Sequence, residues 1–232
     1  MTGGSRTTFA TGWAAVNADR NMIIDLKNRL SLIWEIETEQ IAFENGNFSS
    51  KADSELSINI RDLAKKLDGT GGAVSAVGSV DLDSSTHGFG THIVDLEIDP
   101  ETGKTDIIKY TAAQDVGRAI HPSYVEGQIQ GGAAQGIGWA LNEEYFIDEK
   151  GKMLNSSYLD YRMPTALDLP MIDTILVENE NPEQPFGVRG VGEVPICPPL
   201  GAISNAIKDA LGIRLNDLPM KPSVILKALS KK

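Results

Sequence analysis

The 232-residue sequence contains one cysteine, Cys197, and no long hydrophobic run. A single cysteine excludes an internal disulfide and any metal site built from a cysteine cluster, and it is typical of a cytoplasmic protein. The longest apolar stretches fall far below the ~18 residues that a membrane span requires, so no membrane role is expected. The N-terminus lacks a charged region followed by an apolar stretch, and a secretory signal is therefore not predicted.

Basic residues are scarce relative to acidic ones. Lysine and arginine together number 21 and aspartate and glutamate 32, which gives a formal net charge of −11 at pH 7. A field of this sign repels nucleic acid phosphates and anionic lipid, so neither is an expected partner. Hydrophobic residues make up 41% of the chain, as in ordinary globular proteins, and the length is sufficient for a hydrophobic core.

Apolar spacing predicts both helices and strands along the chain. Spacings of three, four and seven predict a long amphipathic helix over about residues 14–43. Alternation on both sides of a Pro-Glu-Thr-Gly turn predicts a hairpin over residues 91–113, and a further strand is predicted over residues 172–178. A helix from about residue 122 to residue 145 begins with a proline, and a last helix covers about residues 200–211.

These elements do not alternate regularly as strand and helix, which favours an α+β fold over a doubly wound parallel sheet. The chain is interpreted as one domain over residues 1–232, and a division into two lobes of about 1–110 and 111–232 is left open. The sequence shows no convincing internal repeat and no low-complexity linker.

The N-terminal segment Gly3-Gly4-Ser5-Arg6-Thr7-Thr8 precedes the predicted long helix. Successive glycine amides and small hydroxyls before a helix N-terminus provide hydrogen-bond donors and partial positive charge, which suit an anionic phosphate. The alternative is a frayed chain end whose serine and threonine cap the helix. Spacing alone leaves both interpretations open.

Five glycines lie in the helix that is predicted to begin at residue 122, at positions 127, 131, 132, 136 and 138. Each costs about 1 kcal/mol relative to alanine, so something is expected to approach the helix very closely there. A neighbouring helix or strand is one explanation. The other is a ligand, because Gln135 between the glycines offers both a donor and an acceptor to a heterocycle.

A third candidate is Glu193 in the loop Gly190-Val191-Gly192-Glu193-Val194-Pro195. A lone carboxylate among small and apolar residues is costly to bury without a partner, and such a group suits general-base chemistry. The alternative is an exposed loop glutamate near the start of a helix. The three histidines are too scattered to form a zinc cluster, so no metal ligand is predicted among the side chains.

Five motifs occur in order along the chain: GSRTTFATG, DLEIDPETG, DVGRAIHPSYVEGQIQGGAAQGIGWALNEEY, LNSSYLDYRMPTALDLP and PFGVRGVGEVPICPP. Together they resemble the molybdenum hydroxylases, the xanthine dehydrogenase and aldehyde oxidase family. The similarity is to the C-terminal half of the molybdopterin-binding subunit. It implies the α+β fold of the second molybdopterin-binding domain of the xanthine dehydrogenase type, with mixed sheets and long helices.

The resemblance also implies roles for particular residues. Glu193 falls at the position of the family's active-site base, and Gln135 falls where the family has a glutamine beside the molybdenum cofactor. The metal has no protein ligand in this family. The remaining cofactor-binding positions implied by the match are Gly192 and the segment that binds the pterin phosphate, namely Gly4, Ser5, Arg6, Thr7 and Thr8.

This segment departs from the animal enzymes, in which smaller residues are common at the positions of Arg6, Thr7 and Thr8. An arginine suits an extended anionic cofactor, and bacterial members of the family generally use the cytosine dinucleotide form of molybdopterin. We therefore expect molybdenum to be bound through molybdopterin cytosine dinucleotide.

The family's chemistry implies that a carbon of a small N-heterocycle or aldehyde is hydroxylated, with water as the oxygen source and Glu193 as the proton acceptor. Electrons then pass through [2Fe-2S] clusters to FAD. One cysteine cannot hold such a cluster, so an iron-sulfur subunit and an FAD subunit are expected as partners. The N-terminal half of the molybdenum subunit is a third expected partner, because nothing in this chain matches it, and a broad apolar face is predicted on the chain.

Two alternatives stay open. One is a reductive or carbon monoxide-oxidising relative, because several branches of the family share the loop around Glu193. The other is a non-catalytic structural subunit of such a complex, against which the presence of both Glu193 and Gln135 argues. The identity of the substrate does not follow from fold and cofactor.

Overall fold

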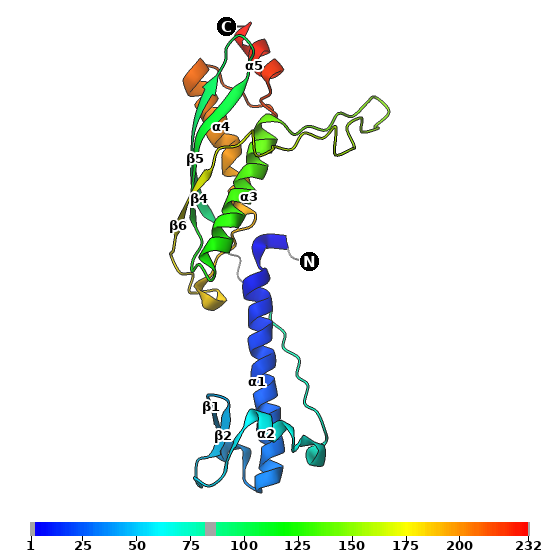
Figure 1. Cartoon of the computed structure of the whole chain (residues 1–232), viewed down its shortest axis with the longest axis vertical. Helices are drawn as coiled ribbons and strands as arrows, with labels where there is room; N and C mark the ends of the chain where they lie inside the picture. The colour runs from blue at the N-terminus through cyan, green and yellow to red at the C-terminus, as the bar shows by residue number, and fades with distance from the viewer. Residues whose placement is uncertain (1–2, 82–86, 232) are drawn as a thin grey trace. The chain divides into compact units, whose positions relative to one another are not determined.

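The structure, a computed structural model, describes residues 3–81 and 87–231 (Figure 1). The described residues form two compact units, of which the smaller contains residues 7–81 and the larger combines residues 3–6 with residues 87–231. The boundary considered near residue 110 falls inside a strand, β5 (Thr105–Asp115), so it does not separate two lobes. Tyr110 pairs with Val94 on one side and with Ile172 on the other, and these pairings hold the strand within one sheet.

The smaller unit begins with the long helix α1 (Thr7–Trp34). The expected helix over residues 14–43 is confirmed over residues 14–34. It begins earlier than predicted, at Thr7, and its C-terminal end was predicted wrongly. Residue Glu35, directly after α1, has a left-handed backbone with φ 55°, and Ile41–Glu44 forms the strand β1. Asn45 and Gly46 follow with φ 49° and 78°, the conformation that a tight two-residue hairpin turn requires. This turn returns the chain as β2 (Asn47–Ser50).

A small antiparallel sheet in the order β1-β2-β3 packs with α1, and β3 spans Ser57–Asn59. The short helix α2 (Ile60–Ala64) and the 3₁₀ turns η2 (Thr38–Gln40) and η3 (Leu67–Thr70) complete this unit. Its core is apolar and small, as expected for one helix on one sheet, and consists of Leu26, Leu30, Ile41, Phe48, Leu63 and Leu67.

The stretch after η3 lies along α1 without regular secondary structure, as Figure 1 shows. Side-chain amides of α1 hold it: Asn21 Nδ2 donates to the Val77 carbonyl and Asn17 Nδ2 donates to the Ser79 carbonyl, both at 2.9 Å. A Cβ at Gly78 would lie 2.1 Å from the Ala14 carbonyl oxygen, so only glycine allows this close approach.

The larger unit is built on a sheet in the order β4-β5-β6, with β4 at Phe89–Ile98 and β6 at Ile172–Val177. The expected hairpin is confirmed, because β4 and β5 are antiparallel partners. The expected strand is confirmed as β6, which pairs with β5 in parallel. The chain crosses from β5 to β6 through α3 (Pro122–Leu141), which begins with Pro122 as predicted.

Helices α3, α4 (Pro198–Leu211) and α5 (Pro222–Leu229) pack against the sheet of the larger unit. The sequence predicted α4 but not α5. Figure 1 shows α3 and α4 beside the strands, and their apolar faces form one core with the inward face of the sheet. The core includes Tyr110, Ala112, Ile129, Ile137, Ile203, Ile207 and Ile225. Helices packed on an antiparallel pair with a parallel third strand confirm the predicted α+β class with mixed sheets.

No helix in the described part of the chain is both long enough and apolar enough to cross a membrane.

Candidate functional site

Ser5 and Glu193 lie in contact, although 188 positions separate them in the sequence. Ser5 is in the 3₁₀ turn η1 (Gly3–Ser5), and Glu193 directly precedes the 3₁₀ turn η5 (Val194–Ile196). The Ser5 hydroxyl donates to Glu193 Oε2 at 3.1 Å, and the Glu193 amide N–H donates to Ser5 Oγ, also at 3.1 Å. Two sequence motifs that were predicted to share one site therefore meet in the larger unit.

The loop before Glu193 is held by an ion pair at Arg189. Arg189 Nε lies 3.0 Å from Asp115 Oδ2, and the two side chains are only 12% and 11% exposed. The other Asp115 oxygen accepts the Gly117 amide N–H at 2.9 Å. The Arg189 amide N–H also donates to the Val116 carbonyl at 3.0 Å, so the loop is tied to the end of β5 by side chain and backbone together.

The loop after Glu193 packs against α3 at two of the five glycines. A Cβ at Gly132 would lie 2.4 Å from Pro195 Cγ, and a Cβ at Gly136 would lie 2.3 Å from the Ile196 carbonyl oxygen. The close approach that the glycines predicted is confirmed. The approaching elements are η5 and, at Gly136, the first turn of helix α4, where a Cβ would lie 2.6 Å from Pro199 Cγ. Gly127 and Gly131 differ, because a Cβ at either would meet nothing within 4 Å.

Gln135 is exposed on α3. The glutamine that reaches the Glu193 loop is Gln128, seven residues earlier and therefore on the same flank two turns away. A Cβ at Gly192 would lie 3.4 Å from Gln128 Oε1 and 3.2 Å from Ser5 Oγ. Gln128 was not singled out from the sequence, where its only signal is the seven-residue spacing to Gln135.

The predicted phosphate segment has an unusual backbone. Gly4 and Ser5 have φ values of 75° and 53°, so two consecutive residues adopt the left-handed conformation. A left-handed serine costs roughly 1–3 kcal/mol and persists only where the surrounding structure holds it. Arg6 is exposed, and a Cβ at Gly4 would meet nothing within 4 Å, so an anion could approach amides and guanidinium here. Thr7 and Thr8 open α1 and are exposed in the smaller unit.

Glu193 itself is exposed in this chain. The larger unit also contains a partly buried titratable pair, in which His92 Nδ1 lies 2.8 Å from the hydroxyl of the buried Tyr110. Burial lowers the pKa of His92 to about 4 and raises the pKa of Tyr110. The Glu143 carboxylate, which accepts the Tyr161 hydroxyl at 2.6 Å, raises the pKa of Tyr161 to about 12.

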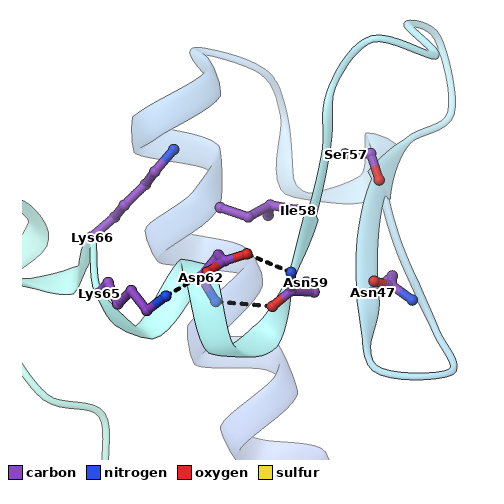
Figure 2. A pocket seen from close by; sticks show the side chains of 7 residues that line it. All are labelled: Asn47, Ser57, Ile58, Asn59, Asp62, Lys65 and Lys66. Atoms are coloured by element: carbon purple, nitrogen blue, oxygen red, sulfur yellow. Dashed lines mark hydrogen bonds and ion pairs between the residues drawn. The ribbon is translucent and has the colours of Figure 1, made fainter.

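A concave surface in the smaller unit lies between β2, β3 and α2, and Figure 2 shows the residues that line it. Polar side chains that line this surface already bind one another: Asp62 accepts a hydrogen bond from Asn59 Nδ2 at 2.6 Å and forms an ion pair with Lys65 Nζ at 2.8 Å. None of the predicted site residues lines this surface. Within residues 3–81 and 87–231, no group of three histidine, cysteine, aspartate or glutamate side chains is arranged to hold a metal ion.

A sequence profile of the molybdopterin cofactor-binding domain matches residues 1–170. The chain belongs to this family. Subunit gamma of the 6-hydroxypseudooxynicotine dehydrogenase complex of Paenarthrobacter nicotinovorans is 31% identical over 231 residues, which are 95% of this chain and 29% of that protein. The xanthine dehydrogenase molybdenum-binding subunit of Escherichia coli O157:H7 is 41% identical over 153 residues, or 66% of this chain and 20% of that protein.

The structure of reconstituted CO dehydrogenase from Oligotropha carboxidovorans is similar to this molybdopterin cofactor-binding domain, with a TM-score of 0.77 and 26% identity. The similarity covers 98% of this chain and 29% of that chain. The resemblance to molybdenum hydroxylases indicated by the motifs is confirmed. This chain spans less than a third of the length of each of these relatives.

Proposed function

We propose that the chain provides the general base and part of the cofactor site of a molybdenum hydroxylase. The reaction would hydroxylate a carbon of a small N-heterocycle or aldehyde with oxygen from water. The observation that carries this proposal is the paired hydrogen bonding of Ser5 and Glu193, because it joins the predicted cofactor segment to the predicted base.

The cofactor segment fits an anionic group. The left-handed Gly4 and Ser5 supply backbone N–H donors, the exposed Arg6 supplies positive charge in a chain of net charge −11, and open space flanks Gly4. In this proposal Gly4, Ser5 and Arg6 hold the phosphate of the pterin. Thr7 and Thr8 open α1 in the smaller unit, and their contribution to the cofactor site stays a prediction from the family resemblance.

Molybdopterin in the cytosine dinucleotide form, when bound, would supply the metal and accept the two electrons of the oxidation. Gly192 would allow a close approach beside the base, because it has no side chain. Gln135 would add an amide from the exposed flank of α3, where Gln128 already reaches the same loop.

Glu193 would act as the proton acceptor. Its carboxylate is exposed and can therefore meet a reactant, and the Ser5 hydrogen bond fixes its direction. A general base must lie within hydrogen-bond reach of the proton that it removes. A carboxylate held in one orientation is correctly placed for this in every catalytic cycle. The pairing of Arg189 with Asp115 supports this role, because it fixes the preceding part of the loop.

The chain would work with partner subunits, namely the N-terminal half of the molybdenum subunit, an iron-sulfur subunit and an FAD subunit. Residues 143–171 support an extensive interface, since they project from the end of α3 without regular helix or strand, as Figure 1 shows. Tyr158, Leu159 and Leu167 in this segment are 97%, 94% and 98% exposed. Apolar side chains so fully exposed and so close in sequence are typical of a protein interaction site.

Two relatives support an N-heterocycle as the substrate class, since xanthine and the nicotine derivative named for the Paenarthrobacter complex both contain aromatic nitrogen rings. The similarity to CO dehydrogenase supports the second candidate, carbon monoxide oxidation. Turnover of the assembled complex on heterocycles, aldehydes and carbon monoxide separates these classes.

The base assignment is tested with Glu193→Ala in the assembled complex. Turnover should fall about 100-fold or more, the range that general-base catalysis contributes, while the molybdenum content remains normal. Full turnover in this variant would contradict the proposal. Release of cytidine monophosphate on hydrolysis of the extracted pterin tests the dinucleotide form, and its absence would exclude that form.

A further inference from the structure

Ser5 occupies a backbone conformation that suits glycine better than serine. Its φ of 53° follows Gly4 at 75°. Glycine adopts such angles without a steric cost, so the conformation alone does not require a serine at position 5. The hydrogen bonds of the serine hydroxyl therefore offset the free-energy cost of the strained backbone.

Both hydrogen bonds described for this hydroxyl go to one residue. Ser5 Oγ donates to the Glu193 carboxylate and accepts from the Glu193 amide, each at 3.1 Å. A hydroxyl has one donor and two acceptor positions, so a single side chain can fix the backbone and the carboxylate of Glu193 together. This limits both the position and the rotation of the glutamate.

The neighbouring glycines show that the contact is tightly packed. A Cβ at Gly190 would lie 2.7 Å from Ser5 Cβ, and a Cβ at Gly192 would lie 3.2 Å from Ser5 Oγ. Any larger residue at position 190 would therefore displace Ser5 from Glu193. The two glycines of the loop make room for the serine that holds the glutamate.

We infer that Ser5 is a positioning residue for Glu193, and that its hydroxyl orients the Glu193 carboxylate for proton transfer. The inference rests on the proposed function of Glu193 as the base. It goes beyond that proposal, because it gives Ser5 a role toward the glutamate in addition to the cofactor. Through this contact, ordering of the Gly4 to Arg6 segment would also order the base.

The test compares Ser5→Ala, Ser5→Gly, Glu193→Gln and the double variant Ser5→Gly/Glu193→Gln in the assembled, cofactor-loaded complex. Ser5→Gly removes the hydroxyl without backbone strain, so it remains informative if Ser5→Ala folds poorly. Ser230→Ala in the last turn of the chain is the control. Hydrogen exchange of a peptide containing Glu193 is measured together with kcat, KM and molybdenum content.

Loss of the Ser5 hydroxyl should accelerate exchange at the Glu193 amide, because that amide loses its acceptor. It should lower kcat about 10- to 100-fold with KM changed less than about threefold, as a misdirected catalytic group does. The double variant should turn over as slowly as Glu193→Gln and no slower. The Ser5 hydroxyl affects turnover through Glu193, and the backbone N–H groups assigned to the cofactor are retained in Ser5→Gly.

Unchanged exchange in both Ser5 variants would overturn the inference, and so would a double variant clearly slower than Glu193→Gln. A Glu193→Gln variant with full turnover would instead reject the proposed function, and with it any catalytic role of Ser5. The exchange measurement still reports on the contact itself, so the two failures are distinguishable.

Discussion

Ser5 Oγ lies 3.1 Å from the Glu193 amide nitrogen and 3.1 Å from Glu193 Oε2. This double contact joins positions that are 188 residues apart, with Ser5 before α1 and Glu193 after β6. The contact brings together two motifs that are far apart in the sequence, as the proposed site requires. It also explains the glycines at positions 190 and 192, where a side chain would crowd Ser5.

The packing of η5 on α3 predicts that Gly136→Ala destabilises the protein. The new methyl group would lie 2.3 Å from the Ile196 carbonyl and 2.6 Å from Pro199 Cγ, which are backbone and ring atoms that cannot move easily. Overpacking of this kind costs about 1–3 kcal/mol in the free energy of unfolding, measured by urea denaturation of the purified chain. Gly131→Ala is the matched control, because it enters open space and should be neutral or stabilising by up to about 1 kcal/mol. Equal losses in both variants would argue against this packing.

The ion pair of Arg189 with Asp115 predicts a large effect for Arg189→Ala. Removing the arginine leaves the carboxylate of a side chain that is 11% exposed without its cation, which costs about 3 kcal/mol in the free energy of unfolding. Lys104→Ala is the comparison, because Lys104 pairs with Asp106 at 2.9 Å with both side chains more than half exposed. Its loss should change the free energy of unfolding much less, because solvent screens an exposed ion pair. Similar urea midpoints for the two variants would show that the buried pair does not hold the loop.

The half-buried His92 predicts a loss of stability in acid. Its pKa is about 4 in the folded chain and near its ordinary value of 6.5 when unfolded, so the unfolded state binds the proton first as the pH falls. The contribution of His92 to stability is therefore complete above pH 6.5 and is lost as the pH falls toward 4. The melting temperature of a His92→Gln variant should depend less on pH in this window than that of the parent chain. His121→Gln, at an exposed position, should keep the parental dependence, and parallel curves for all three proteins would refute this role.

The exposed leucines of the projecting segment over residues 143–171 predict that a charge placed at them weakens binding to the proposed partner subunits. Leu159→Asp combined with Leu167→Asp should reduce co-purification with the other subunits, because both side chains are almost fully exposed in the chain alone. Lys150→Asp in the same segment, at an exposed turn, is the charge control. Recovery of the intact complex with the double variant would exclude this segment from the interface.

Local pattern was sufficient to predict the elements whose signals lie within a few residues. The β4–β5 hairpin follows from its alternation and turn, and the start of α3 follows from Pro122. The end of α1 was missed, although Asn45 and Gly46 are a strong hairpin signal, because the helical spacing of apolar residues continues past Trp34. The strand at Ile41–Glu44 forms because it pairs with β2, and the spacing of apolar residues along the sequence does not reveal such pairing.

The site was predictable in its motifs but not in its contacts. Glu193 and the segment at Gly4 were identified from residue type, glycine content and resemblance to a family. The ion pair of Arg189 with Asp115 joins positions 74 residues apart, and the approach of Gln128 to Gly192 depends on how η5 packs against α3. Such relationships arise from tertiary packing, so no local spacing rule contains them.

The central claim is that Glu193 is the proton acceptor of the reaction, and Glu193→Gln tests it most directly. This substitution preserves size and hydrogen bonding to Ser5 but removes the basic carboxylate. Steady-state turnover and molybdenum content are measured in the assembled complex, with Glu101→Gln in the exposed β4–β5 turn as the control. The account predicts a fall in kcat of about 100-fold or more with normal molybdenum content, and parental turnover in the control. A Glu193→Gln complex that retains normal molybdenum and parental turnover would contradict it.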